Sequence, residues 1–209
     1  MSPRHTAQQV DVAREVFGEQ FPLINRYVDI LGSTGVEWGL LGPRETDRLW
    51  DRHILNSAAL SGLIARGSSV VDVGSGAGLP GIPLALLRPD LRVTLLEPLL
   101  RRATFLTQTV EELRIANRAK VIRSRAEDHH GNYDVVTSRA VAPLDRLVGW
   151  CNPLRARRGM ILALKGSSVA DEVAAATRRL ESANLKVEVI LARAHPDAQP
   201  ATVVRLSEV

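Results

Sequence analysis

An aspartate followed by closely spaced glycines is the part of this sequence best suited to chemistry. An apolar run begins at Val70 and meets the carboxylate of Asp72. Four glycines come next, at Gly74, Gly76, Gly78 and Gly81. Such a run is typical of a buried strand that ends in a tight turn and opens a helix. Because glycine lacks a Cβ, this turn can adopt positive φ and lie against a ligand, so we expect main chain to contact a small molecule here.

Two classes of ligand fit a glycine-rich turn of this kind. A dinucleotide site requires G-x-G-x-x-G directly after the strand, and Gly76, Gly78 and Gly81 have that spacing but begin two residues late. Counted from the strand end, the pattern is D-x-G-x-G-x-G, with Asp72 first. A carboxylate there disfavours a pyrophosphate and suits the ammonium and sulfonium groups of S-adenosylmethionine. The spacing therefore favours a methyl donor, with a dinucleotide and a turn without any ligand as the alternatives.

The elements that would position this turn alternate between strand and helix from residue 69 onward. The predicted strands are 69–73, 92–97, 120–124, 133–137, 160–164, 186–192 and 201–207, and the predicted helices are 81–87, 99–117, 142–152 and 169–183. This alternation indicates a parallel sheet covered on both faces. The linker 193–200 is too short for a crossover, so the last two strands must pair antiparallel. Seven mostly parallel strands with an antiparallel last strand is the α/β plan of the Rossmann-like class I methyltransferases.

The residues before this domain have a helical pattern instead. Apolar residues recur at helical spacing between Val12 and Leu31, and Pro22 is expected to interrupt or restart the helix. A loop is expected over 32–42 and a second helix over 44–65. We therefore divide the chain into an N-terminal helical extension, 1–66, and a methyltransferase domain, 67–209.

Ligands of open α/β sheets bind at the carboxyl ends of the strands, where several candidate residues fall. Glu97, at the end of the second strand, could accept hydrogen bonds from ribose hydroxyls. Ala126 and Glu127 follow the third strand, where an adenine would be recognised. Arg139 follows the fourth strand, where the acceptor must meet the methyl group. Arg139 could contact substrate or cofactor, or form a salt bridge to a nearby aspartate.

The charge and the cysteine count of the chain exclude several classes of site and protein. The 209 residues carry a formal charge of +4 and contain one cysteine, Cys151. One cysteine allows neither an internal disulfide nor a cysteine zinc cluster, and we expect no metal site. Cys151 lies in a predicted helix, so we interpret it as packed rather than nucleophilic. No apolar run is long enough for a membrane span and the N-terminus lacks a secretory pattern, so we expect a cytoplasmic protein, as a monomer.

Basic residues gather at the predicted strand ends and suggest phosphate contacts. The candidates for binding RNA are Arg101, Arg102, Arg139 and Lys165. With only three tryptophans, three phenylalanines and two tyrosines in the chain, no aromatic platform for single-stranded RNA is evident.

Five strings in this order resemble one known family. They are DVGSGAGLPGIPLA, LLEPLLRRATFL, RAED, YDVVTSRAVAPL and ALKG, and the earlier LWDRHILNSAAL is also similar. The chain is identified by this resemblance as a member of the bacterial small-subunit ribosomal guanine-7 methyltransferases, formerly called glucose-inhibited division protein B. The resemblance implies methyl transfer from S-adenosylmethionine to ring nitrogen 7 of a guanine in 16S rRNA. It also implies that five residues contact or adjoin the cofactor: Gly74, Leu79, Ala126, Glu127 and Arg139.

Two departures from the family pattern are visible. Glu97 and Pro98 stand where the family usually has aspartate and serine, and Asn56 stands where it usually has aspartate. Glutamate can still hold a ribose with one more methylene of reach. The missing charge at Asn56 puts an acid–base or RNA role of that helix in doubt.

The implied chemistry also agrees with what the sequence lacks. Ring nitrogen 7 of guanine carries a lone pair and no proton, so no general base is required and we assign no catalytic residue. The alternatives are a methyltransferase for a protein or small molecule, a dinucleotide-binding regulatory module, and a non-catalytic ribosome-assembly factor.

Overall fold

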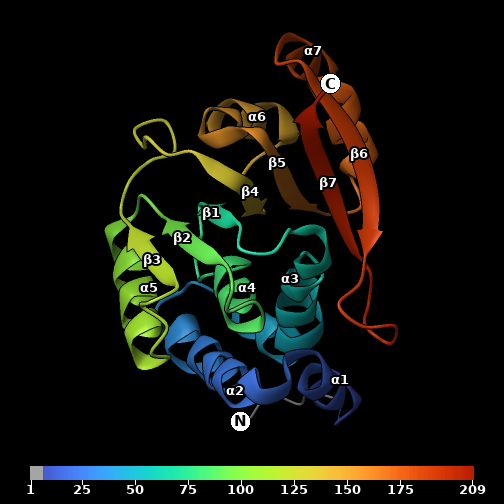
Figure 1. The fold of residues 1–209 in the computed structure, drawn as a ribbon. Coiled ribbons are helices and arrows are strands. Elements are labelled where there is room, and N and C mark those ends of the chain that lie inside the picture. Colours follow the sequence, from blue (N-terminus) through green and yellow to red (C-terminus); the bar gives the residue numbers. More distant parts are fainter. Residues whose placement is uncertain (1–6) are drawn as a thin grey trace.

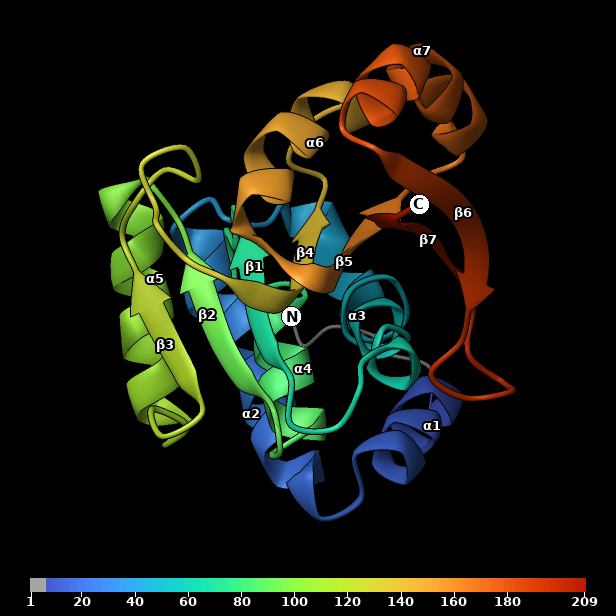
Figure 2. The same cartoon turned by 45° about the horizontal axis from the view of Figure 1, so that its top comes forward.

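The centre of the molecule is a seven-stranded sheet with the order β3-β2-β1-β4-β5-β7-β6, which can be followed from one edge to the other in Figure 2. The computed structural model describes residues 7–209. The strands are β1 Ser69–Val73, β2 Arg92–Leu96, β3 Ala119–Ile122, β4 Tyr133–Arg139, β5 Arg155–Lys165, β6 Leu185–Ala192 and β7 Ala201–Glu208. The strands β1 to β5 pair in parallel, and β7 is antiparallel to both of its neighbours. The predicted fold class is confirmed.

Alternating side chains of the strands divide the core into two layers. Val70 of β1 belongs to the cluster that packs on the N-terminal helices, α4 and α5, whereas Val71 and Val73 pack on α6 and α7. This alternation is the two-residue period of a strand. The helices are α1 Ala7–Phe17, α2 Phe21–Ile30, α3 Asn56–Ala58, α4 Gly81–Leu87, α5 Leu100–Glu112, α6 Leu144–Cys151 and α7 Val169–Ser182. Figure 1 shows α6 and α7 on one side of the sheet and α1 to α4 on the other.

The order of the strands creates a switch point between β1 and β4. The chain runs from β1 through β2 to β3 on one side, then crosses to β4 on the other side of β1. The connections that leave the carboxyl ends of β1 and β4 therefore diverge, and this leaves a crevice in which open α/β sheets bind ligands. The glycine-rich turn and Arg139 both lie at this edge.

The N-terminal segment differs most from its sequence prediction. Pro22 lies in the first turn of α2, so it restarts the helix as expected. The expected loop 32–42 begins instead with a π-helical turn, Leu31–Gly35. The expected continuous helix 44–65 is divided into Pro43–Arg48, a π-helical turn Leu49–Leu55, α3 and Ser61–Leu63. The predicted extension 1–66 begins with residues that lie outside the described part of the chain.

Smaller differences concern element ends. The helix predicted over 99–117 ends at Glu112, because Arg114 adopts a φ of 55° and the chain turns there. The strand predicted over 160–164 starts earlier, at Arg155, which pairs with Tyr133 across an irregularity in the β4–β5 ladder. Among residues 7–209, no helix is long and apolar enough to cross a membrane.

We predict that the N-terminal helices and the sheet unfold as one unit, because their apolar side chains form one cluster. Leu31→Ala removes a side chain that is 0% exposed within that cluster. The substitution should lower the free energy of unfolding by about 2–5 kcal/mol in a single transition. Leu191→Ala makes the same chemical change at a side chain that is 70% exposed, and it should change stability by less than about 0.5 kcal/mol. Urea titrations that resolve a separate transition for the N-terminal helices would contradict this expectation.

Candidate active site

The turn that follows β1 depends on glycines with left-handed backbone. Gly74, Gly76 and Gly78 have φ angles of 70°, 58° and 100°. The amides of Gly74 and Ser75 donate to the carbonyl of Leu96, at 2.8 and 3.1 Å, which fastens the turn to the end of β2. Positive φ is costly for any other residue, so the glycines are what allow the backbone to bend here.

Asp72 supports this turn from below. Its side chain is 0% exposed, and its Oδ2 accepts a hydrogen bond of 3.0 Å from the amide of Gly81, at the start of α4. Its Oδ1 is buried and has no hydrogen-bond partner among the described residues. Burial raises the pKa of Asp72 to about 7, opposed by the hydrogen bond from Gly81. Asp72 lines none of the three cavities that open at the carboxyl edge of the sheet, so the structure places it beneath the turn and not on a cavity wall.

Glu97 fastens the turn from the other side. Its Oε2 accepts a hydrogen bond of 2.9 Å from the amide of Gly76, and its Oε1 accepts one of 3.1 Å from the amide of Leu99. The side chain is 1% exposed, yet it forms part of the cavity wall. A carboxylate can accept about four hydrogen bonds, so each oxygen keeps capacity for a ligand hydroxyl.

Two of the three cavities at the carboxyl edge of the strands adjoin the glycine turn. The smaller, of about 220 Å³, is mostly apolar; the larger has a volume of about 630 Å³. The smaller is lined by Val73, Gly74, Leu96, Pro98, Ser124, Arg125, Ala126, Glu127, Val141 and Trp150. The larger includes Gly74, Gly76, Leu79, Glu97, Arg102 and Arg139 in its wall. The predicted cofactor residues therefore gather around these two cavities, with the exceptions of Asp72, which lies below the turn, and Gly78, which lines neither.

Arg139 is held by a chain of polar groups that the sequence did not indicate. One terminal nitrogen of its guanidinium lies 2.5 Å from Nδ1 of His53, and Nε2 of His53 lies 2.8 Å from Oε2 of Glu45. Burial, together with the charge of Arg139, lowers the pKa of His53 to about 4. Because neutral histidine has one donor and one acceptor, Nδ1 accepts from Arg139 and Nε2 donates to Glu45. Among residues 7–209, Arg139 forms no salt bridge to an aspartate.

The basic residues that were predicted to bind RNA occupy different environments. Arg101 and Arg102 are exposed in the first turn of α5, and Arg102 lines the larger cavity. Lys165 instead donates to the carbonyl of Ala142, at 2.7 Å, and to Oε2 of Glu172, at 2.8 Å. Its side chain is only 7% exposed. The ion pair with Glu172 neutralises the ammonium, while Lys165 also lines a cavity that includes Arg139. Its contact with RNA stays a prediction.

Cys151 has the environment of a packed residue. It is 0% exposed, and burial raises the pKa of its thiol to about 12. A thiol of this kind is protonated at neutral pH and is a poor nucleophile. Within residues 7–209, no group of histidine, cysteine, aspartate and glutamate side chains is arranged to hold a metal ion.

Comparison with known proteins shows the family to which the chain belongs. The GidB family, described as rRNA small subunit methyltransferase G, matches residues 20–199. The chain belongs to this family. Ribosomal RNA small subunit methyltransferase G of Mycobacterium avium is 51% identical over 198 residues, which cover 92% of this chain and 80% of the relative. The corresponding protein of a Nocardioides species is 56% identical over 176 residues, covering 83% and 70% of the two chains.

A solved structure supports the fold alone. The precorrin-6y C5,15-methyltransferase of Geobacter metallireducens has a TM-score of 0.55 at 15% identity, and the match covers 81% of this chain and 91% of that one. Membership in the GidB family makes this protein an enzyme, an S-adenosylmethionine-dependent methyltransferase of small-subunit ribosomal RNA.

The members of the site that sequence reasoning missed come mainly from the N-terminal segment. The hydroxyl of Tyr27, on α2, donates a buried hydrogen bond of 2.7 Å to the carbonyl of Ala77 in the glycine turn. Glu45 reaches His53 over eight positions of irregular chain, a spacing that matches no helical or strand period. Local patterns therefore contained no signal for this part of the GidB site.

We predict that the charge of Asp72 makes stability depend on pH. Its pKa rises from 3.8 to about 7 on folding, so the folded state holds the proton more tightly. The stability that the protonated carboxyl of Asp72 contributes is fully present below pH 3.8 and is lost as pH rises through 7. Asp72→Asn removes this titration, so the variant should gain stability relative to the unmodified protein as pH increases, by a few kcal/mol across that window. Urea unfolding at a series of pH values measures the difference.

Asp90→Asn is the matched control, because the pKa of Asp90 shifts in the opposite direction on folding. The hydrogen bond from Arg88 lowers the pKa of Asp90 below its ordinary value of 3.8. The stability that Asp90 contributes is therefore present above pH 3.8 and is lost in acid, so this variant should be weakened at neutral pH. A stability difference for Asp72→Asn that does not vary with pH would show that its carboxyl does not titrate between the two states.

Proposed function

We propose that this protein transfers the methyl group of S-adenosylmethionine to ring nitrogen 7 of one guanine in 16S rRNA. The observation that supports it most is that the glycine turn, Glu97 and Arg139 surround one cavity at the switch point of a chain of the GidB family. Bound S-adenosylmethionine would supply an electrophilic methyl group on a sulfonium. The residues of the chain would bind, orient and shield the two reactants.

The cavities suit the parts of this cofactor. The small apolar cavity between Leu96, Ala126 and Trp150 fits an adenine ring, and Glu127 lies at its wall. Glu97 would receive the ribose hydroxyls, as its free lone pairs allow. The amino-acid part would lie along the main chain of the glycine turn, where an added Cβ on Gly74 would come within 2.9 Å of Val141. In its ionised form, Asp72 below the turn would attract the cationic groups of the cofactor.

No side chain needs to remove a proton in this reaction. Guanine nitrogen 7 is an acceptor without hydrogen, and it can attack the methyl group directly. Both ring nitrogens of His53 are already engaged, by Arg139 and by Glu45, so His53 is not free to act as a base. Arg139 lines the cavity, and its remaining N–H groups can hold the guanine, whose O6 is an acceptor beside nitrogen 7.

The N-terminal extension has a defined place in this proposal. We divide the chain at residue 66 because 67–209 contains all seven strands, whereas 1–66 supplies Glu45 and His53 to the acceptor side of the cavity. The described site is built from one chain, which supports a monomer. Its 16S rRNA or small-subunit substrate supports action in the cytoplasm. Light scattering of the purified protein tests the monomer directly.

The test of the reaction is mass spectrometry of 16S rRNA from cells with and without this protein. One guanine should lose the mass of a methyl group in the deletion strain and regain it when the gene is restored. Purified small subunits, naked 16S rRNA and a panel of proteins and metabolites should then be offered with labelled methyl donor. Label that enters only a protein or a metabolite would overturn the proposal in favour of the alternative substrates, and binding of subunits without any methylation would favour an assembly factor.

We predict that Arg139 needs both its charge and its planar shape. Arg139→Lys keeps the charge but loses the fork that contacts His53, so turnover on subunits should fall about 10- to 100-fold. His53→Phe keeps the ring volume and removes the nitrogen that holds Arg139, so turnover should fall in the same direction by a smaller factor. Arg92→Lys, on an exposed residue at the start of β2, is the control. Single-turnover rates and S-adenosylhomocysteine affinity would be measured, and an unchanged rate and affinity for Arg139→Lys would disprove its role.

A further inference from the structure

We propose that a basic groove between α6 and α7 binds the ribose-phosphate backbone of ribosomal RNA outside the target nucleotide. This inference rests on the proposed function and names a second contact surface for the same substrate. The groove has a volume of about 700 Å³. It is lined by Asp145, Arg146, Gly149, Trp150, Ala175, Arg178 and Arg179. None of these residues was among those that the sequence indicated for RNA.

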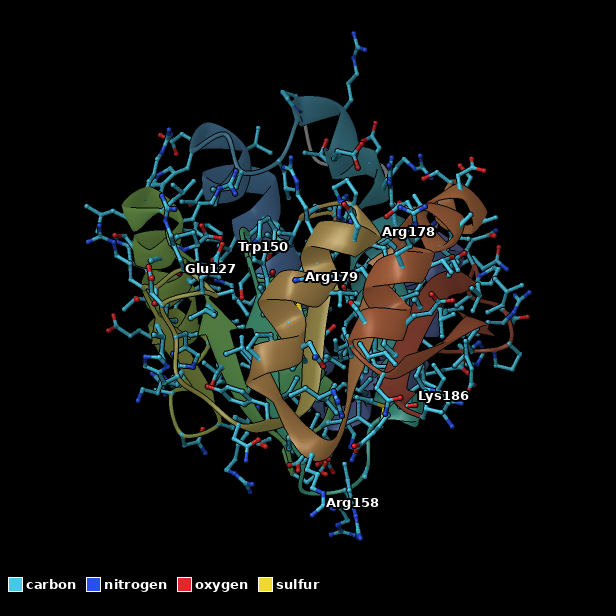
Figure 3. All side chains as sticks on the ribbon, turned by 90° about the horizontal axis from the view of Figure 1, so that it is seen from above. Glu127, Trp150, Arg158, Arg178, Arg179 and Lys186 are labelled. Carbon is cyan, nitrogen blue, oxygen red and sulfur yellow. The ribbon has the colours of Figure 1, made fainter. Side chains whose placement is uncertain are left out.

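The arrangement of the groove follows from helical spacing. Arg146 and Trp150 are four residues apart on α6, so their side chains project from the same face. Arg178 and Arg179 stand three and four residues after Ala175 on α7. Figure 3 shows the labelled side chains of Trp150 and the two α7 arginines on the surface formed by these helices.

Small residues keep the groove open. Gly149 lies between the charged and aromatic groups of α6, and an added Cβ there would come within 2.9 Å of a terminal nitrogen of Arg179. Ala175 leaves similar space on α7. The guanidinium of Arg179 therefore lies across α6 and brings the positive charge of α7 toward the indole of Trp150.

The charge of the groove is not neutralised by the protein. Among residues 7–209, the side chains of Arg146, Arg178 and Arg179 form no ion pair, in contrast to Arg26, Arg52, Arg88 and Arg205. Asp145 is the single carboxylate of the groove wall, which leaves an excess of two positive charges. Unpaired arginines that converge on one hollow are suited to phosphate oxygens, which accept their N–H groups in pairs.

Trp150 connects the groove with the cofactor site. It lines both the groove and the small apolar cavity, so the two hollows share this residue. Tryptophan offers a flat face on which a base or ribose can stack. RNA in the groove would therefore lie one side chain away from the bound cofactor, close enough to belong to the same molecule as the target guanine. The combination of an indole with free guanidiniums favours RNA over an acidic protein surface.

The test compares two variants with the same change in charge. The groove variant is Arg146→Gln/Arg178→Gln/Arg179→Gln. The control variant is Arg66→Gln/Arg157→Gln/Arg158→Gln, whose exposed arginines lie near the amino ends of the strands, where Figure 3 shows Arg158 far from Trp150. Equilibrium binding to naked 16S rRNA and to small subunits would be measured over a range of salt concentrations, with unfolding midpoints to confirm that both variants fold.

The groove variant should bind RNA at least about 10-fold more weakly than the control. The slope of log affinity against log salt should fall in magnitude by about two to three. Each phosphate contact that is lost lowers the magnitude of this slope by a little less than one. Affinity for S-adenosylhomocysteine should stay unchanged. Asp145→Asn should act in the opposite direction and tighten RNA binding, because it removes the only negative charge of the groove wall.

Two results would overturn the proposal. Equal affinities and salt slopes for the groove and control variants would show that the arginines are only a solvated surface. A loss confined to assembled subunits, with binding to naked 16S rRNA unchanged, would assign the groove to a ribosomal protein. Failure of the proposed function is a separate result: the unmodified protein would then leave every guanine of 16S rRNA unmethylated, whatever the binding measurements show.

Discussion

The bend of the chain after β1 is the feature on which the remainder of the site depends. A stretch of main chain with three left-handed glycines has few side chains to pack, so hydrogen bonds must hold its shape, beginning with those of Gly74 and Ser75 to Leu96. Buried side chains add three more hydrogen bonds. Asp72 accepts one from the amide of Gly81, at the start of α4. Glu97 accepts one from the amide of Gly76, and Tyr27 donates one to the carbonyl of Ala77. Burying a carboxylate is unfavourable unless N–H groups satisfy it, and the amides of Gly81 and Gly76, which bind one oxygen each of Asp72 and Glu97, belong to the loop or to its continuation. The same hydrogen bonds that offset the burial of charge therefore fix the shape of the turn.

Arg139 shows how the two parts of the chain depend on each other. It is at the end of β4, yet its nearest partner, His53, comes from the N-terminal segment. Burial lowers the pKa of both groups, so each loses part of its preference for the charged form. The guanidinium keeps its proton because its ordinary pKa is so high, whereas the imidazole becomes the neutral acceptor. The neutral ring of His53, which is bound to Glu45, holds the guanidinium of Arg139 in place without adding a second positive charge to the cavity.

The sequence predicted the sheet well because its signals are local. Each strand is a short apolar run that lies between turn residues, and β1, α4 and α7 were found within one residue of their actual ends. Glu97 and Arg139 could be placed at the cavity because parallel strands end at one edge. Glu45 could not be placed, since it reaches its partner through irregular turns whose geometry is set by packing on the sheet. The ion pair of Lys165 could not be predicted for a related reason: the carboxylate that neutralises it, Glu172, comes from α7, a later element.

The net charge of the chain does not show where a polyanion such as RNA could bind. A net charge of +4 over 209 residues is small, and it averages paired with unpaired groups. What attracts a polyanion is the local field of charges that have no internal partner, and this field is strongest where a hollow holds several of them against a low-dielectric wall. Lys165 contributes one positive charge to the net charge, but Glu172 neutralises it. Arg178 and Arg179 contribute one charge each and form no ion pair among the described residues. For a reaction that needs no general base, alignment of the RNA is the main task left to the protein, and unpaired guanidiniums beside the cofactor cavity are well placed to perform it.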